Sequence, residues 1–247
     1  SVSQKGTHNF CVAKCYDSSL FSEPNTESIL RNLHHEGIPD YCDSYKNDSM
    51  FVIVRSYIEG TPLSDYARNN DLSQEEIVQL CIKLSDVLIY LHNQTPPVIH
   101  RDIKPENIIV TENEDVVLID FDIARTFKTA EESDTVFFGT KGYAPPEQYG
   151  FAQTNTRSDI YSFGVLLRFL LTDSVRENHK IRLYKPLRNI ITKCTAFDPK
   201  NRYSGMNQVK RALLNANPRS QVIRIVRISI CVLAVMVVVS FAGKTAY

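Results

Sequence analysis

His100-Arg-Asp-Ile-Lys-Pro-Glu-Asn107 opens the stretch of sequence that decides the fold. The chain continues as Ile108-Ile-Val110, Thr111-Glu-Asn-Glu-Asp115, Val116-Val-Leu-Ile119 and Asp120-Phe-Asp122. Two short apolar runs thus flank a polar turn, which is the pattern of an antiparallel β-hairpin. We expect the polar residues just outside this hairpin to meet at its open end.

The turn sets the register of the predicted hairpin. With the turn centred on residues 113–114, Ile108 pairs with Ile119, and Asn107 lies opposite Asp120. The amide oxygen of Asn107 and the carboxylate of Asp120 then converge at the open end. Such hard oxygen ligands are what Mg²⁺ prefers when it also holds phosphates.

Two further side chains lie in the loop before the hairpin. Asp102 is close enough to accept a proton from an incoming hydroxyl group. Lys104, two residues on, can reach a transferred phosphoryl group as a point charge. Together with Asn107 and Asp120, these residues predict a site for phosphoryl transfer.

The stretch resembles the catalytic loop and metal-binding motif of eukaryotic-type (Hanks-type) serine/threonine protein kinases. The resemblance covers about residues 8–214, and within the family the sequence is most similar to bacterial membrane-bound kinases. Five more motifs resemble the family in the same order, namely Val12-Ala-Lys14, the strand and hinge Phe51–Gly60, the activation-segment end Gly139–Glu147, the helix Ser158–Gly164 with Asp159, and Asp198–Arg202.

The resemblance implies ATP and Mg²⁺ (or Mn²⁺) as cofactors and assigns roles to the central residues. Lys14 would hold the α and β phosphates of ATP. Asp120 and Asn107 would hold the metal ions. Asp102 would orient the substrate hydroxyl group, and Lys104 would steady the γ phosphate.

The same resemblance implies roles for residues around this centre. Ser56 and Ile58 of the hinge would meet adenine, and Thr140 would shape the site for a Ser or Thr hydroxyl group. Arg101 would receive a phosphate from the activation segment. Glu147 would pair with Arg202. The candidate phosphorylation sites, among which the sequence does not choose, are Thr126, Thr129, Ser133 and Thr135.

The sequence departs from the family pattern in several places. Only thirteen residues precede Lys14, so the glycine-rich loop is missing and we expect an N-terminally incomplete small lobe. Thr26 stands where the helix glutamate that pairs with the strand lysine is expected. Glu27, one step on, is the favoured substitute, and Glu23, one turn earlier, is the alternative. Asp122 replaces the usual glycine of the metal motif. Arg55 stands at the position that in the family usually guards the back of the adenine pocket, and its long side chain could restrict that pocket.

We therefore expect an α+β, two-lobed, kinase-like fold with one C-terminal transmembrane helix. Strands are predicted at residues 8–16 and 50–58, and a capping box at Ser73 and Glu76 begins a helix. Further helices are predicted over residues 26–33, 158–171, 184–196 and 204–215. The expected parts are a partial small lobe with hinge at 1–60, a large lobe at 61–216, a basic juxtamembrane segment at 217–227 and the membrane helix at 228–242.

The membrane helix is predicted from fifteen residues without a charge, Ile228 to Ala242, and its start lies near Val222 when the flanking residues are included. A buried core helix is the alternative. Four arginines between 211 and 227 precede the segment and only Lys244 follows it. The positive-inside rule then predicts a single-pass protein of the cell membrane with a cytoplasmic kinase domain.

Composition excludes one class of function and leaves others open. The 28 basic residues equal the 28 acidic ones, so a nucleic-acid-binding surface is not expected. The six cysteines lack zinc-site spacing and are predicted to be reduced core residues. The implied partners are protein substrates, the membrane and a homodimer for trans-autophosphorylation. The alternatives are a catalytically impaired pseudokinase that acts as a membrane-tethered binding module, and a small-molecule phosphotransferase.

Overall fold

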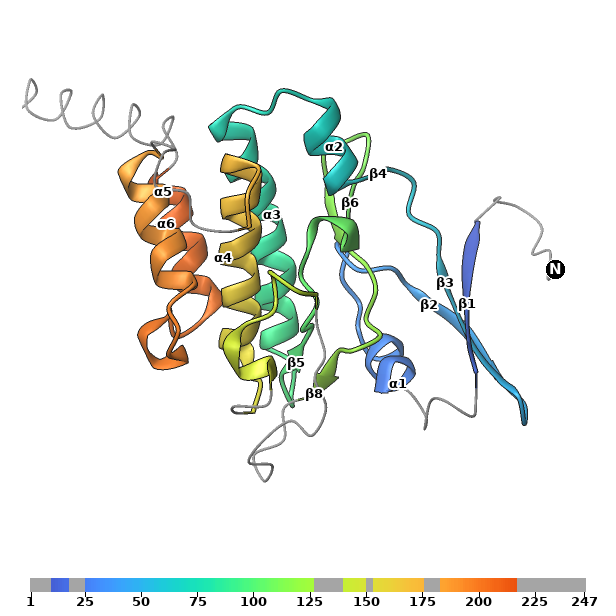
Figure 1. Ribbon diagram of the computed structural model, residues 1–247. Coiled ribbons are helices and arrows are strands. Elements are labelled where there is room, and N and C mark those ends of the chain that lie inside the picture. The colour runs from blue at the N-terminus through green and yellow to red at the C-terminus, as the bar shows by residue number, and fades with distance from the viewer. Residues whose placement is uncertain (1–9, 18–24, 127–139, 150–152, 176–182, 217–247) are drawn as a thin grey trace, which may run out of the picture.

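A computed structural model describes residues 10–17, 25–126, 140–149, 153–175 and 183–216 (Figure 1). A small antiparallel sheet and one helix form one side of the molecule, and a group of longer helices forms the other. The predicted α+β architecture, with a small strand-rich part before a larger helical part, is confirmed.

The small sheet holds the first half of the candidate site. Its strands are β1 (Cys11–Asp17), β2 (Tyr41–Lys46) and β3 (Met50–Ser56), in the order β1-β3-β2. Lys14 of β1 pairs with Ile53 of the central strand β3. Helix α1 (Asn25–Arg31) lies beside β2. The two predicted strands and this helix are confirmed, whereas β2 was not predicted.

In the described ranges, five helices build the larger part, and each has an apolar face toward a shared core. Helix α3 starts at the capping box of Ser73 and Glu76, as predicted, and packs against α6 and α4. The predicted helices of the second half of the chain are also present. The bounds are α2 (Leu63–Asn69), α3 (Gln74–His92), α4 (Thr156–Thr172), α5 (Lys185–Cys194) and α6 (Met206–Ala216).

Short strands and turns connect the helices to the catalytic loop. One small sheet has the order β4-β6-β7, and β5 pairs with β8. Among the residues that the structure describes, three 3₁₀ turns add to these connections. The bounds are β4 (Thr61–Pro62), β5 (Val98–Ile99), β6 (Ile108–Val110), β7 (Val116–Leu118), β8 (Arg125–Thr126), and the turns Pro105–Asn107, Pro146–Tyr149 and Pro199–Asn201.

The predicted hairpin is present as β6 and β7, but its predicted register is wrong by one residue. Ile108 pairs with Leu118 instead of Ile119. The cause is a three-residue loop, 112–114, in which Glu114 takes a left-handed φ of 59°. The backbone N–H of Ile119 therefore donates to the carbonyl of Asn107 at 2.8 Å, and Asp120 comes one position later.

Two other predictions meet the structure only in part. Among the described cysteines, Cys81 and Cys194 are buried as predicted, but Cys11, Cys15 and Cys42 are exposed on the small sheet. The predicted membrane segment 228–242 lies outside the described residues. Within the described ranges, no helix has both the length and the apolar character needed to cross a bilayer.

We expect Gly164→Ala to destabilise the contact between α4 and α5. An added Cβ at Gly164 would lie 2.4 Å from the Cβ of Cys194, so the two helices would have to move apart. The free energy of unfolding should fall by about 1–3 kcal/mol, although alanine favours a helix over glycine by about 1 kcal/mol. Urea titration measures the change. Gly205→Ala is the control, because a Cβ there meets nothing within 4 Å. Equal effects of both substitutions would contradict the prediction.

Candidate active site

One buried carboxylate holds the loop before the hairpin in place through hydrogen bonds to its backbone. Asp159 of α4 is fully buried and accepts hydrogen bonds from the backbone N–H groups of His100 at 3.0 Å and Arg101 at 2.9 Å. His92 Nε2 lies 2.8 Å from the same carboxylate. Arg101 adopts a left-handed φ of 67°, which costs a non-glycine residue about 1–2 kcal/mol. Its carbonyl accepts a hydrogen bond from Gln148 Nε2 at 2.9 Å, so both sides of this peptide are held.

Four predicted residues meet just after the backbone that Asp159 holds. Asp102 accepts hydrogen bonds from Lys104 Nζ at 2.7 Å, Asn107 Nδ2 at 2.8 Å and Thr140 Oγ1 at 2.7 Å. Lys104 Nζ also donates to Thr140 Oγ1 at 2.9 Å. Asp102 and Lys104 are mostly shielded, with side chains 13% and 20% exposed. The cluster therefore gives one carboxylate a fixed direction beside one ammonium group.

A second charged group links the small sheet to the end of the hairpin. Lys14 Nζ lies 2.7 Å from Asp120 Oδ1 and 2.5 Å from Asp122 Oδ2. Although partial burial opposes the charged ammonium, these two carboxylates raise the pKa of Lys14 above its ordinary value. Burial likewise works against the Asp120 carboxylate, but Lys14 lowers its pKa below the ordinary range. Lys14 and Asp120 are thus brought together, as the predicted roles require.

The structure does not pair Glu27 with Lys14, so this prediction is wrong. Glu27 Oε1 instead accepts from Arg31 at 2.7 Å and from Ser44 at 2.8 Å. The physical reason is local, since Arg31 lies one turn further along α1 and Ser44 lies on the neighbouring strand β2. The contact of Lys14 with Asp122 was not predicted either, because it joins residues 108 positions apart.

A histidine and a phenylalanine join the catalytic loop to the residues after the hairpin. The rings of His100 and Phe121 meet edge to face, with centroids 4.8 Å apart. His100 Nδ1 accepts from the backbone N–H of Asp102, and Nε2 lies 3.2 Å from the carbonyl of Ile119. Complete burial lowers the pKa of His100, which favours the neutral ring with its proton on Nε2. The neutral ring thus fixes Asp102 relative to Ile119, the residue before Asp120.

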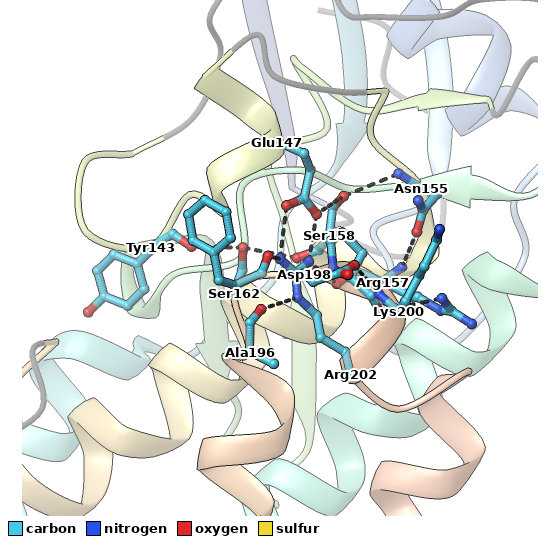
Figure 2. A network of polar contacts seen from close by, with 12 residues as sticks. Tyr143, Glu147, Asn155, Arg157, Ser158, Ser162, Ala196, Asp198, Lys200 and Arg202 are labelled. Atoms are coloured by element: carbon cyan, nitrogen blue, oxygen red, sulfur yellow. Dashed lines mark hydrogen bonds and ion pairs between the residues drawn. The ribbon is translucent and has the colours of Figure 1, made fainter.

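Glu147 and Arg202 form the predicted ion pair, which Figure 2 shows within a network of polar contacts. Arg202 Nη1 and Nη2 donate to the two oxygens of Glu147 at 2.6 and 2.9 Å. Ser158 Oγ donates to Glu147 as well, at 2.8 Å. Arg202 also donates to three backbone carbonyls, those of Ala196, Arg157 and Phe197. The pair ties the turn Pro146–Tyr149 to the start of α4 and the segment before α6.

The remaining predicted residues have partners or positions that can be stated briefly. Ser56 Oγ accepts from the backbone N–H of Asp40 at 2.9 Å, and Ile58 is half-buried just after β3. Arg55 lines a small cavity together with Lys14 and Phe121.

Arg101 is buried, and its Nε donates to the carbonyl of Ile123 at 2.6 Å. Thr126 pairs with Val98 between β8 and β5. The other three candidate phosphorylation sites, Thr129, Ser133 and Thr135, lie outside the described residues.

Comparison with known families agrees with this arrangement. The sequence matches the family described as protein kinase domain over residues 2–179, well over half of the 247 residues. The chain belongs to the protein kinase family.

Individual kinases resemble this chain over its central part. A leucine-rich repeat receptor-like serine/threonine-protein kinase of Arabidopsis thaliana is 36% identical over 153 residues, 58% of this chain and 17% of that protein. The serine/threonine-protein kinase cds1 of Schizosaccharomyces pombe is 34% identical over 154 residues, 60% of this chain and 33% of that protein. Serine/threonine-protein kinase D of Synechocystis is 29% identical over 209 residues, 75% of this chain and 40% of that protein. The chain thus spans well under half the length of these relatives.

We expect Arg202→Ala to destabilise the kinase domain strongly, because it leaves the buried Glu147 carboxylate without its charged partner. The loss of unfolding free energy should be about 3–5 kcal/mol. Arg68→Ala is the matched control, since Arg68 pairs with Asp65 at the surface and such pairs contribute about 1 kcal/mol at most. Thermal and urea unfolding of both variants test this difference. Similar losses would show that burial of the Glu147 pair is not what matters.

Proposed function

We propose that this chain carries the catalytic domain of an ATP- and Mg²⁺-dependent serine/threonine protein kinase. The observation that carries the proposal is the Asp102 cluster, in which a carboxylate, an ammonium group and a threonine hydroxyl group are bonded to one another. A binding module that signals by shape alone needs none of these charged groups in contact. The retained cluster therefore favours the enzyme over the pseudokinase.

The donor set suits a divalent metal ion and phosphates. Asn107 donates through Nδ2 to both the carbonyl and the carboxylate of Asp102, which leaves Oδ1 as the amide atom able to bind a metal ion. Asp120 supplies a carboxylate from just beyond the end of β7. Two oxygen ligands plus phosphates are the environment that Mg²⁺ takes in phosphoryl-transfer sites. When bound, the metal neutralises charge on the phosphates of ATP.

Each protein group then has a separate task in phosphoryl transfer. Asp102 orients the substrate hydroxyl group and accepts its proton, since its direction is fixed by three donors. Lys104 Nζ has three N–H donors, of which the bonds to Asp102 and Thr140 use two. It can therefore also stabilise charge on the transferred phosphoryl group. Lys14 binds the α and β phosphates from the opposite lobe.

Protein substrates with Ser or Thr are the acceptors that fit best. Thr140 contacts both Asp102 and Lys104, so the activation-segment end takes part in the site and can align an incoming chain. The relatives named as serine/threonine-protein kinases support the same class of substrate. A small-molecule phosphotransferase shares the acidic groups but does not need this segment.

The hinge and the activation segment complete the proposed kinase. Ser56 ends β3 and Ile58 lies just after it, where both would meet adenine. Arg101 would receive the phosphate of a modified activation-segment residue, and two copies of the chain would phosphorylate each other in trans. We propose the domain division 1–60, 61–216, 217–227 and 228–242 on the same basis.

We further propose that residues 228–242 anchor the kinase in the cell membrane, with the catalytic domain in the cytoplasm. The support is the uncharged fifteen-residue run and the excess of arginines before it. The receptor-like relative from Arabidopsis thaliana is consistent with a membrane location.

Asp102→Asn should reduce phosphate transfer to a generic protein substrate by about 10²–10⁴-fold, because asparagine cannot accept the hydroxyl proton. Transfer of ³²P from ATP to casein or myelin basic protein measures this loss. Asp65→Asn, at an exposed position of α2, removes the same charge and should leave transfer unchanged. Equal transfer by the wild type and Asp102→Asn would contradict the enzyme and favour a pseudokinase.

Placing arginine at both Ala234 and Val237 should release the chain from membranes, since each charge at the centre of a span costs about 2.5–3.5 kcal/mol. Fractionation of expressing cells, with an alkaline carbonate wash, measures the membrane-bound share. Ala234→Leu with Val237→Leu is the control and should stay in the pellet. Retention of the double arginine variant after the wash would argue against a spanning helix.

A further inference from the structure

Asp122 stands in the metal motif where the family usually has glycine, and its carboxylate contacts Lys14 and Tyr16. Oδ2 lies 2.5 Å from Lys14 Nζ, and Oδ1 accepts a hydrogen bond from the Tyr16 hydroxyl group at 2.6 Å. Each oxygen is thus held by a residue of β1. A glycine at this position could make neither contact.

Tyr16 is itself well fixed. It is 6% exposed, and its ring packs near that of Phe51 with centroids 6.1 Å apart. Tyr16 follows Lys14 by two residues on the same strand, so both side chains face the same side of the sheet. Lys14 and Tyr16 therefore both contact the carboxylate of Asp122 from strand β1.

In this family a helix glutamate orients the strand lysine, but in the described part of the chain no glutamate of α1 contacts Lys14. Glu27 is bonded to Arg31 and Ser44, and Lys14 is bonded to Asp120 and Asp122. Asp120 is also the carboxylate proposed to bind the metal ion. If Asp120 turns to the metal, Asp122 is the carboxylate that, among the described residues, remains in contact with Lys14.

We propose that Asp122, fixed by Tyr16, is the residue that positions Lys14 for the phosphates of the nucleotide. This inference rests on the proposed kinase function and adds a positioning residue to it. Asp122 acts through Lys14, so it needs no contact with the nucleotide. Removing its charge should weaken binding of phosphate-bearing nucleotides and leave binding of the nucleoside unchanged.

The test compares ADP with adenosine in binding to the full chain, by isothermal titration calorimetry or a competed fluorescent nucleotide. Asp122→Asn keeps the size of the side chain and an acceptor for Tyr16 but loses the charge beside Lys14. We expect about tenfold weaker ADP binding, given the usual strength of charged hydrogen bonds at a site about one-third exposed. Adenosine binding should change less than about twofold. Tyr16→Phe should give a smaller loss in the same direction, and Asp48→Asn, an exposed loop residue, should change neither affinity.

Three comparisons separate positioning from other roles. In a Lys14→Met background, Asp122→Asn should cause little further loss of ADP affinity, because its effect passes through Lys14. The loss in the single variant should persist in EDTA, whereas the loss of a metal ligand would disappear there. The KM for ATP should rise more than kcat falls.

Equal losses for ADP and adenosine, full additivity with Lys14→Met, or a loss that vanishes in EDTA would each overturn the inference while leaving the kinase intact. Unchanged ADP affinity in Asp122→Asn would do the same. A different result, in which Lys14→Met itself leaves ADP affinity unchanged, would overturn the proposed nucleotide site and this inference together.

Discussion

The geometry of the catalytic loop depends on the buried carboxylate of Asp159. A charge without access to water is costly unless hydrogen bonds satisfy it, and here two backbone N–H groups and His92 do so. In return, the peptide of Arg101 is held in a left-handed conformation that it would not adopt alone. That conformation turns the chain so that Asp102 faces Lys104, Asn107 and Thr140. Helix α4 thus determines where the proposed acid-base group lies, although α4 itself contributes no group to the cluster.

The charged groups of the kinase fall into two kinds with different consequences. The side chains of Lys14 and Asp120 are 34% and 31% exposed, and those of Lys104 and Asp102 are 20% and 13% exposed. Water therefore reaches both pairs, which leaves them freer to change partners than a buried pair. Glu147 and Arg202 are almost completely buried and have no such freedom. The first kind suits groups that must act on a substrate. The second kind suits groups that must keep the activation-segment end in place.

The sequence predicted the composition of the site better than its detailed contacts. Asp102, Lys104 and Asn107 could be placed together because they lie within six residues, and Glu147 with Arg202 because of motif resemblance. The hairpin register was wrong by one, since a left-handed conformation at Glu114 is not apparent in a polar turn. Strand β2 was missed because Tyr41-Cys-Asp-Ser-Tyr-Lys46 is mostly polar and exposed. The partners of Lys14 could not be foreseen, because they depend on how the small sheet meets the end of the hairpin. The sequence feature that could have indicated a shared partner was Tyr16, which lies two residues after Lys14 on the same face of the strand.

In the ion pair between Glu147 and Arg202, the cation and the anion cannot exchange positions. The guanidinium group serves five acceptors at once, two carboxylate oxygens and three backbone carbonyls, through its fan of N–H groups. A carboxylate at position 202 would face those same carbonyls with oxygen atoms and could bond to none of them. The two residues are therefore not interchangeable, because the backbone carbonyls around position 202 can bond only to a donor. Exchanging Glu147 and Arg202 would keep the electrostatic attraction between the two positions but would lose the hydrogen bonds to these carbonyls.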